Sequence, residues 1–192
     1  MTKSLPAVIL IIPQKKVPLM TNYSKTYSEI AAKATYGQIE QASKWYMDAE
    51  RVAAEVARNL KTTLEVGATV VSAFSPRERW TNNVTKAISF SLGNHVPGFK
   101  NNMLMANNAL TMGFKALKGP KTNAFAKAIA GDENAVVIDV WMLRALGIEK
   151  KSPSQSQYVE MANAVRTVSI EYGMTPRAMQ ALIWILVRGS AE

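Results

Sequence analysis

The sequence predicts an all-α protein, folded as a single globular helical domain of about eight helices. Apolar residues recur every three or four positions along most of the chain, as they do on the buried face of a helix. No stretch is convincing as a strand, and no internal repeat, low-complexity tract or mid-chain linker divides the sequence. Its 192 residues suffice for one core but are too few for two full domains.

The first 60 residues predict an N-terminal arm and two helices. Prolines at 6, 13 and 18 make residues 1–23 an extended arm, and the helical domain is expected over 24–192. A short helix is expected around 27–36. Gly37 separates it from a long helix whose apolar face extends to Leu60.

The middle of the chain predicts three further helices. Residues 62–74 fit a short buried helix, although the same apolar run could form a strand. The run SPRE at 75–78 predicts the start of the next helix, since serine caps helices and proline suits the first helical position. A loop at Gly93–Gly98 contains the single histidine, His95, which we interpret as a loop residue rather than a catalytic one. A helix over about 101–116 follows.

The C-terminal part predicts two more helices. Residues 149–156 form a polar connector, and the helix after it ends at Gly173. Thr175 and Pro176 begin the last helix, whose run ALIWILV is apolar on nearly every side and is therefore expected to be buried. The ten methionines and four tryptophans lie along helix faces, and we interpret them first as core residues.

The composition favours an anionic partner and excludes several kinds of site. The formal net charge is +9 and the sequence pI is near 9.8, which favours nucleic acid first and a membrane surface second. The chain has no cysteine, which excludes disulfides, zinc–thiolate sites, iron–sulfur clusters and cysteine nucleophiles. The apolar run at 7–12 is too short for a membrane span or a signal peptide, so we expect a cytoplasmic protein.

The segment from Lys115 to Arg144 contains the side chains best placed for chemistry. It predicts a short hairpin, a helix that begins at Pro120, a turn at 131–134, an apolar run, and a second helix that begins at Asp139. Lys121 falls in the first turn of its helix, where unpaired amides and neighbouring lysines disfavour the ammonium form, as a lysine nucleophile requires. The same amides, beside Gly119, would also suit a phosphate.

Asp139 follows an apolar run that we expect to be buried. A carboxylate there could accept a proton from the lysine or stabilise a cationic sugar. Helix capping alone also explains an aspartate at this position, because aspartate is a favoured N-cap residue.

This segment resembles the helix-hairpin-helix superfamily of DNA glycosylases, the endonuclease III-like group, over roughly residues 100–147. Gly119-Pro120-Lys121-Thr122 matches the hairpin exit, Val137-Ile138-Asp139 matches the apolar run and aspartate, and Arg144 matches the arginine that follows. The spacing of lysine and aspartate also fits the family. The resemblance implies that Lys121 is the catalytic lysine of the bifunctional members and Asp139 the aspartate common to most of them.

The resemblance implies a monomer that binds double-stranded DNA and extrudes one nucleotide from the helix. It implies no cofactor, although the hairpin could hold a monovalent cation. Trp141 and Trp80 are candidates for stacking on the extruded base. The residues expected to contact DNA lie in or after the hairpin: Lys115, Lys118, Gly119, Thr122, Asn123 and Arg144.

The sequence departs from the family at three points. Leu117 stands where the first hairpin glycine is expected, and Trp141 stands where a histidine often follows the aspartate. The iron–sulfur cysteines are missing, which excludes the cluster-bearing subgroup. Leu117 and Trp141 favour an alternative, a non-catalytic DNA-binding protein that retains the fold. A third possibility is a small helical interaction protein with no nucleic-acid role.

Overall fold

The structure, a computed structural model, describes residues 21–189. Within that range the chain forms nine α-helices, one 3-10 helix and no strand, which confirms the prediction of a single all-α domain. In chain order the helices are α1 (Asn22–Ala31), α2 (Tyr36–Asn59), α3 (Leu64–Phe74), α4 (Trp80–Ser91), α5 (Lys100–Met112), the 3-10 helix η1 (Gly113–Ala116), α6 (Pro120–Ile129), α7 (Val140–Ala145), α8 (Gln155–Glu171) and α9 (Pro176–Arg188).

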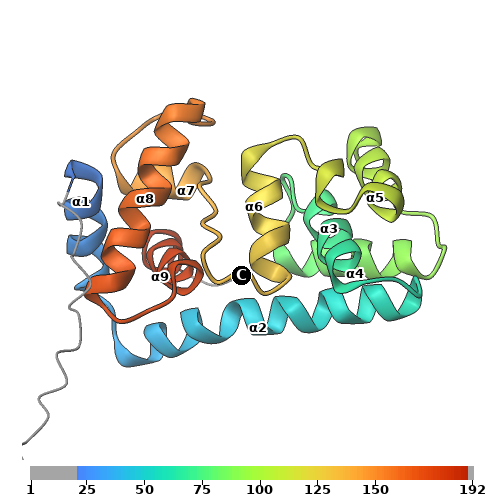
Figure 1. The fold of residues 1–192 in the computed structure, drawn as a ribbon, viewed down its shortest axis with the longest axis horizontal. Coiled ribbons are helices and arrows are strands. Elements are labelled where there is room, and N and C mark those ends of the chain that lie inside the picture. The colour runs from blue at the N-terminus through green and yellow to red at the C-terminus, as the bar shows by residue number, and fades with distance from the viewer. Residues whose placement is uncertain (1–20, 190–192) are drawn as a thin grey trace, which may run out of the picture.

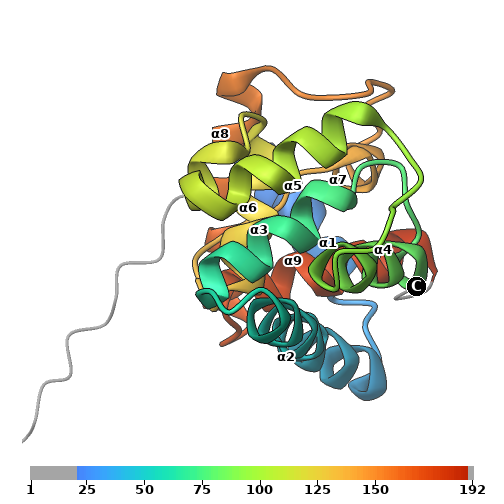
Figure 2. The ribbon, with the colours of Figure 1, turned by 90° about the vertical axis from the view of Figure 1, so that its right-hand side faces the viewer.

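Two groups of helices pack on α2, which runs along one edge of the molecule (Figure 1). One group, which we name the contiguous lobe, contains α3, α4, α5, η1 and α6. The other, which we name the terminal lobe, contains α1, α7, α8 and α9. Helix α2 packs against α3, α4 and α6 in the first lobe and against α9 in the second, so it connects the two (Figure 2).

Small residues let α2 approach its neighbours closely. Its buried face carries Ala42, Ala49 and Ala53, which alternate with larger buried side chains at helical spacing. A Cβ atom on Gly67 of α3 would lie 2.2 Å from the carbonyl oxygen of Ala53, so only glycine permits this crossing of α2 and α3.

The first two helices begin earlier than the sequence predicts. Helix α2 starts at Tyr36, because Thr35 and Gln38 form a capping box, and Gly37 therefore lies inside its first turn rather than between two helices. Helix α1 starts at Asn22, within the residues assigned to the arm, because Thr21 caps it. Residues 1–20 of the predicted arm lie outside the described range.

Two other boundaries in the middle of the chain were predicted wrongly. Ser75 does not cap a new helix: its hydroxyl donates to the carbonyl of Ser72, and Arg77 has a φ of 65°, which a helix does not allow. Helix α4 begins only at Trp80. The helix expected over 101–116 ends at Met112, because Gly113 takes a φ of 52° and the backbone continues as η1.

The remaining helical predictions agree with the structure. Residues 64–74 form a buried helix rather than a strand, and His95 is exposed in the loop between α4 and α5. Helices begin at Pro120, after Asp139 and at Pro176, as their capping residues predict. No helix in residues 21–189 combines the length and the apolar character that a membrane crossing requires.

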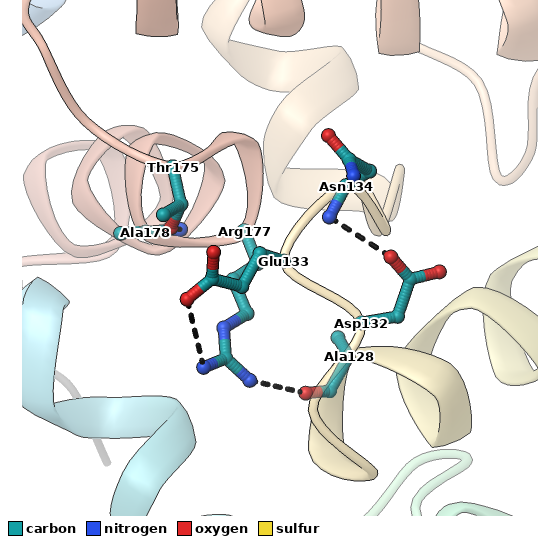
Figure 3. A network of polar contacts seen from close by, with 7 residues as sticks. All are labelled: Ala128, Asp132, Glu133, Asn134, Thr175, Arg177 and Ala178. Carbon is teal, nitrogen blue, oxygen red and sulfur yellow. Dashed lines mark hydrogen bonds and ion pairs between the residues drawn. The ribbon is translucent and has the colours of Figure 1, made fainter.

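Arg177 at the start of α9 fixes the connection between the lobes (Figure 3). Its Nη1 donates to the carbonyl of Ala128 over 2.9 Å, and its backbone N–H donates to the carbonyl of Glu133 over 3.1 Å. Its Nη2 also lies 3.9 Å from the Glu133 carboxylate, and in the same turn the N–H of Asn134 donates to the Asp132 carboxylate over 2.9 Å. These contacts hold the end of α6 against α9 and so position the two lobes.

Candidate active site

A cleft of about 690 Å³ lies between the contiguous and terminal lobes. The contiguous lobe contributes the segment from Ser75 to Asn83 and the first turns of α6 to its walls. The terminal lobe contributes residues 137–141, the connector before α8 and one face of α9, and α2 contributes Trp45 and Tyr46.

The structure brings Lys121 and Asp139 to this common cleft. Lys121 lies in the first turn of α6, directly after Pro120, and its side chain is half-buried. Gly119 gives that helix no side-chain cap, so its first amides have no capping acceptor. No ion pair joins Lys121 to Asp139 or to any other carboxylate in residues 21–189.

Asp139 is the N-cap of α7 and uses most of its hydrogen-bonding capacity within the protein. Its Oδ1 accepts from the backbone N–H groups of Trp141 and Met142, over 2.9 and 3.2 Å. Its Oδ2 accepts from the indole N–H of Trp184 over 3.2 Å. Because a carboxylate has about four acceptor sites, one site on Oδ2 is left for a further donor.

All four tryptophans of the chain line the cleft. Trp45 is central, because its ring centroid lies 5.2 Å from that of Trp80, 5.9 Å from that of Phe125 and 6.3 Å from that of Trp184. The guanidinium of Arg144 lies 4.4 Å above the ring of Trp141. The sequence argument selected Trp80 and Trp141 but missed Trp45 and Trp184, since nothing in the local sequence places α2 and α9 beside the hairpin.

Two buried side-chain amides, those of Asn83 and Gln180, also line the cleft. Asn83 is 2% exposed and lines the cleft, and its Oδ1 is buried without a hydrogen-bond partner in the described chain. Gln180 is 4% exposed, and its Oε1 accepts from the hydroxyl of Tyr46 over 2.7 Å. Neither residue was singled out from the sequence, because a polar residue on an apolar helix face does not by itself indicate a cleft.

The charged residues in the lining are mostly basic. Four are cationic and two are anionic: Arg77, Lys121, Lys151 and Arg188 against Glu78 and Asp139. Glu78 is neutralised by an ion pair with Lys86, so among residues 21–189 Asp139 is the one anion of this lining without an ion-pair partner. The guanidinium of Arg188 lies 4.6 Å above the ring of Trp184.

Three buried tyrosines lie near enough to Asp139 to be affected by its charge. Burial raises the pKa of Tyr158 to about 12, and the charge of Asp139 adds to the effect. Burial likewise raises the pKa of Tyr46 and of Tyr27, again with a contribution from Asp139. All three hydroxyls therefore stay neutral near neutral pH.

Only some of the residues predicted to contact DNA line the cleft. Gly119 and Thr122 line the cleft, whereas Lys115, Lys118 and Arg144 are exposed outside its lining.

Two of the polar side chains in this group bond within the protein. Thr122 Oγ1 donates to the carbonyl of Gly119, and Asn123 Nδ2 donates to the carbonyls of Phe114 and Leu117. The Asn123 amide is therefore used to hold the turn before α6.

The turn before α6 has no backbone angle that requires glycine. Leu117 has φ −94° and ψ 104° and is 3% exposed, so its side chain packs in the core. Gly119 has φ −80° and ψ 137°, which any residue adopts. Residues 117–119 thus form an extended turn without a positive φ. In the described part of the chain, no group of three or more histidines or carboxylates could hold a metal ion.

Comparisons with known proteins identify a family but no characterised relative. Searches of curated proteins and of solved structures return no match. One family model matches residues 12–191, which is nearly the whole sequence. The chain therefore belongs to the family of unknown function DUF7178.

Proposed function

We propose that the protein is a DNA glycosylase with an associated lyase activity, which removes a damaged or modified base from double-stranded DNA. The observation that carries this proposal is the common cleft of Lys121 and Asp139, which is lined by four tryptophans and by more basic than acidic residues. An amine, a carboxylate and an aromatic surface are the groups that base removal through a covalent intermediate requires.

The aromatic lining supports binding of an extruded base. Base–aromatic stacking contributes about 1–3 kcal/mol per base and does not depend on which base is stacked. Trp45 and Trp80 present neighbouring rings in the cleft, and Asn83 and Gln180 add amides that could bond to a base edge.

The reaction would proceed through Lys121. Its neutral Nζ attacks the anomeric carbon of the extruded nucleotide, and the glycosidic bond breaks with its electron pair leaving on the base, which is then protonated. Nζ then carries a positive charge and passes one of its two protons to Asp139. The C1′–O4′ bond breaks as O4′ takes up a proton from water, the lone pair of the nitrogen forms the C=N bond, and a protonated Schiff base results. Loss of a proton from C2′ of that Schiff base expels the 3′ oxygen with the electron pair of its bond to C3′, which cuts the strand.

Asp139 would assist this reaction with the one acceptor site that remains on Oδ2. That site can take the proton released by Lys121, and the carboxylate charge stabilises the cationic sugar as the base leaves. The backbone bonds to Oδ1 keep the carboxylate in place during these steps.

Borohydride trapping on a duplex oligonucleotide with one abasic site tests the proposal. The wild-type protein should form a covalent adduct, and Lys121→Ala should form none. Lys127→Ala is the matched control, because Lys127 lies in the last turn of the same helix, is exposed and does not line the cleft. An adduct that survives in Lys121→Ala, or its absence in the wild-type protein, would contradict the proposed chemistry.

A second candidate function is DNA binding without catalysis. The internal bonds of Asp139 favour it, since capping of α7 already accounts for an aspartate at this position. Binding without an adduct would support it. Binding should weaken at higher salt in either case, because phosphate contacts release counterions. Affinity for duplex DNA that does not change with salt would contradict both functions.

A further inference from the structure

We infer that Trp184 is the positioning residue for Asp139. The inference rests on the proposed function, because it assigns a role to a neighbour of the proposed catalytic carboxylate. Trp184 lies on α9, 45 residues from Asp139 in the sequence, and donates its indole N–H to Oδ2 over 3.2 Å.

The hydrogen bonds of Asp139 divide between its two oxygens. Oδ1 is saturated by two backbone amides of α7, which tie the side chain to the start of its own helix. Oδ2 has one donor, and within residues 21–189 the indole of Trp184 is the sole side chain that donates to this carboxylate. The hydrogen bond from Trp184 therefore occupies one acceptor site of Oδ2 and leaves the other site for a further donor.

The ring of Trp184 has two neighbours in the cleft wall. The guanidinium of Arg188 lies 4.6 Å from its ring centroid, and the ring of Trp45 lies 6.3 Å away. Both neighbours come from helices that also line the cleft. The indole N–H is thus a fixed donor, and little conformational entropy is lost when it bonds to the carboxylate.

Within residues 21–189, no other side chain near Asp139 donates a hydrogen bond to it. Tyr27 on α1, Tyr46 on α2 and Tyr158 on α8 are neutral at working pH, since burial raises the pKa of each. Lys121 on α6 shares the cleft without pairing with Asp139, and Arg188 on α9 lies over the Trp184 ring. Arg144 on α7 lies over Trp141.

The consequence is a loss of rate in the chemical step. Without the indole donor, the open acceptor site of Oδ2 is no longer fixed. The single-turnover rate constant of Trp184→Phe should therefore fall by roughly tenfold, as expected for the loss of one hydrogen bond to a charged group.

NMR spectroscopy tests the contact without any need for activity. The four tryptophans give four indole N–H signals, and Trp184→Phe identifies the signal of Trp184. That signal should move in Asp139→Asn, because the oxygen that accepts the indole N–H is replaced. A Trp184 signal that keeps its wild-type position in Asp139→Asn would overturn the inference.

Single-turnover cleavage of the abasic duplex then tests the positioning role. Trp184→His is the comparison variant, because its ring can still donate an N–H, and it should recover part of the rate that Trp184→Phe loses. Equal losses of rate in the two variants would refute the positioning role.

The two failures are distinguishable. If the wild-type protein cleaves and Trp184→Phe cleaves equally fast, the positioning role is refuted and the proposed function stands. If the wild-type protein forms no adduct although the Trp184 signal moves in Asp139→Asn, the proposed function fails and the contact stands.

Discussion

Replacing Asp139 by asparagine and by alanine separates its structural role from its chemical one. The alanine variant loses both backbone bonds of the α7 cap, which costs about 0.5–2 kcal/mol. It also leaves the Trp184 indole without its acceptor, which costs about 1 kcal/mol for a partly exposed group. We therefore expect Asp139→Ala to lower the free energy of unfolding by about 1.5–3 kcal/mol.

The asparagine variant should lose much less stability. Asparagine caps helices as well as aspartate does, and its amide oxygen can accept both backbone N–H groups. Its amide nitrogen replaces Oδ2, so the bond from Trp184 is lost and about 1 kcal/mol should follow. The variant should bind DNA and fold normally, yet it should lose turnover, because the amide cannot accept the proton.

Urea denaturation followed by far-UV circular dichroism measures both free energies, and the adduct assay measures turnover. Equal destabilisation by the two substitutions would show that the negative charge, rather than the capping geometry, stabilises α7. Wild-type turnover in Asp139→Asn would refute the catalytic assignment and leave the residue as a cap.

Three further predictions concern stability. Arg177→Met should lower the free energy of unfolding by about 2–3 kcal/mol, because its side chain is 13% exposed and loses a charged hydrogen bond. Arg51→Met should lower it by under about 0.5 kcal/mol: its ion pair with Asp48 is shorter, at 2.9 Å, but Arg51 is 77% exposed. Equal losses in urea denaturation would refute this ranking. Asn83→Leu should leave the melting temperature unchanged or raise it, since it removes a buried oxygen without a partner, and a lower melting temperature would reveal a donor in solution. Tyr158 keeps its proton to about pH 12 in the folded protein but loses it near pH 10.0 in the unfolded chain, and burial raises the pKa of Tyr46 and Tyr27 as well. The free energy of unfolding should therefore fall from pH 10 upward, by as much as ~1.4 kcal/mol per pH unit for each tyrosine. Denaturation midpoints that do not change across this range would contradict this prediction.

Local signals in the sequence predicted most of the helices correctly. Proline after a capping residue placed the starts of α6 and α9, and apolar spacing every three or four residues placed the long helix α2. The errors arose where a serine or glycine had a second possible role. Ser75 resembles an N-cap but bonds backwards to α3, and Gly113 ends α5 through a backbone angle that the sequence does not reveal.

The sequence predicted only part of the candidate site. Lys121 and Asp139 could be selected because each begins a helix in one short segment. Trp45, Asn83 and Trp184 could not, since they come from three other helices that meet at the cleft only after α2 has packed against both lobes. Residues that are far apart in the sequence and meet only in the folded protein form no local sequence motif.

The division into lobes has a consequence for the order of folding during synthesis. The contiguous lobe is built from one uninterrupted stretch, residues 64–129, which packs against α2, so its contacts can form while the ribosome is still translating the rest. The contacts of the terminal lobe can form only later, because α1 packs against α8 and the Tyr27 hydroxyl donates to the carbonyl of Met142, 115 residues further along the chain. A nascent chain that is arrested after about residue 130 should therefore resist protease over α2–α6 while its α1 remains sensitive, with the cleft still lacking one of its walls.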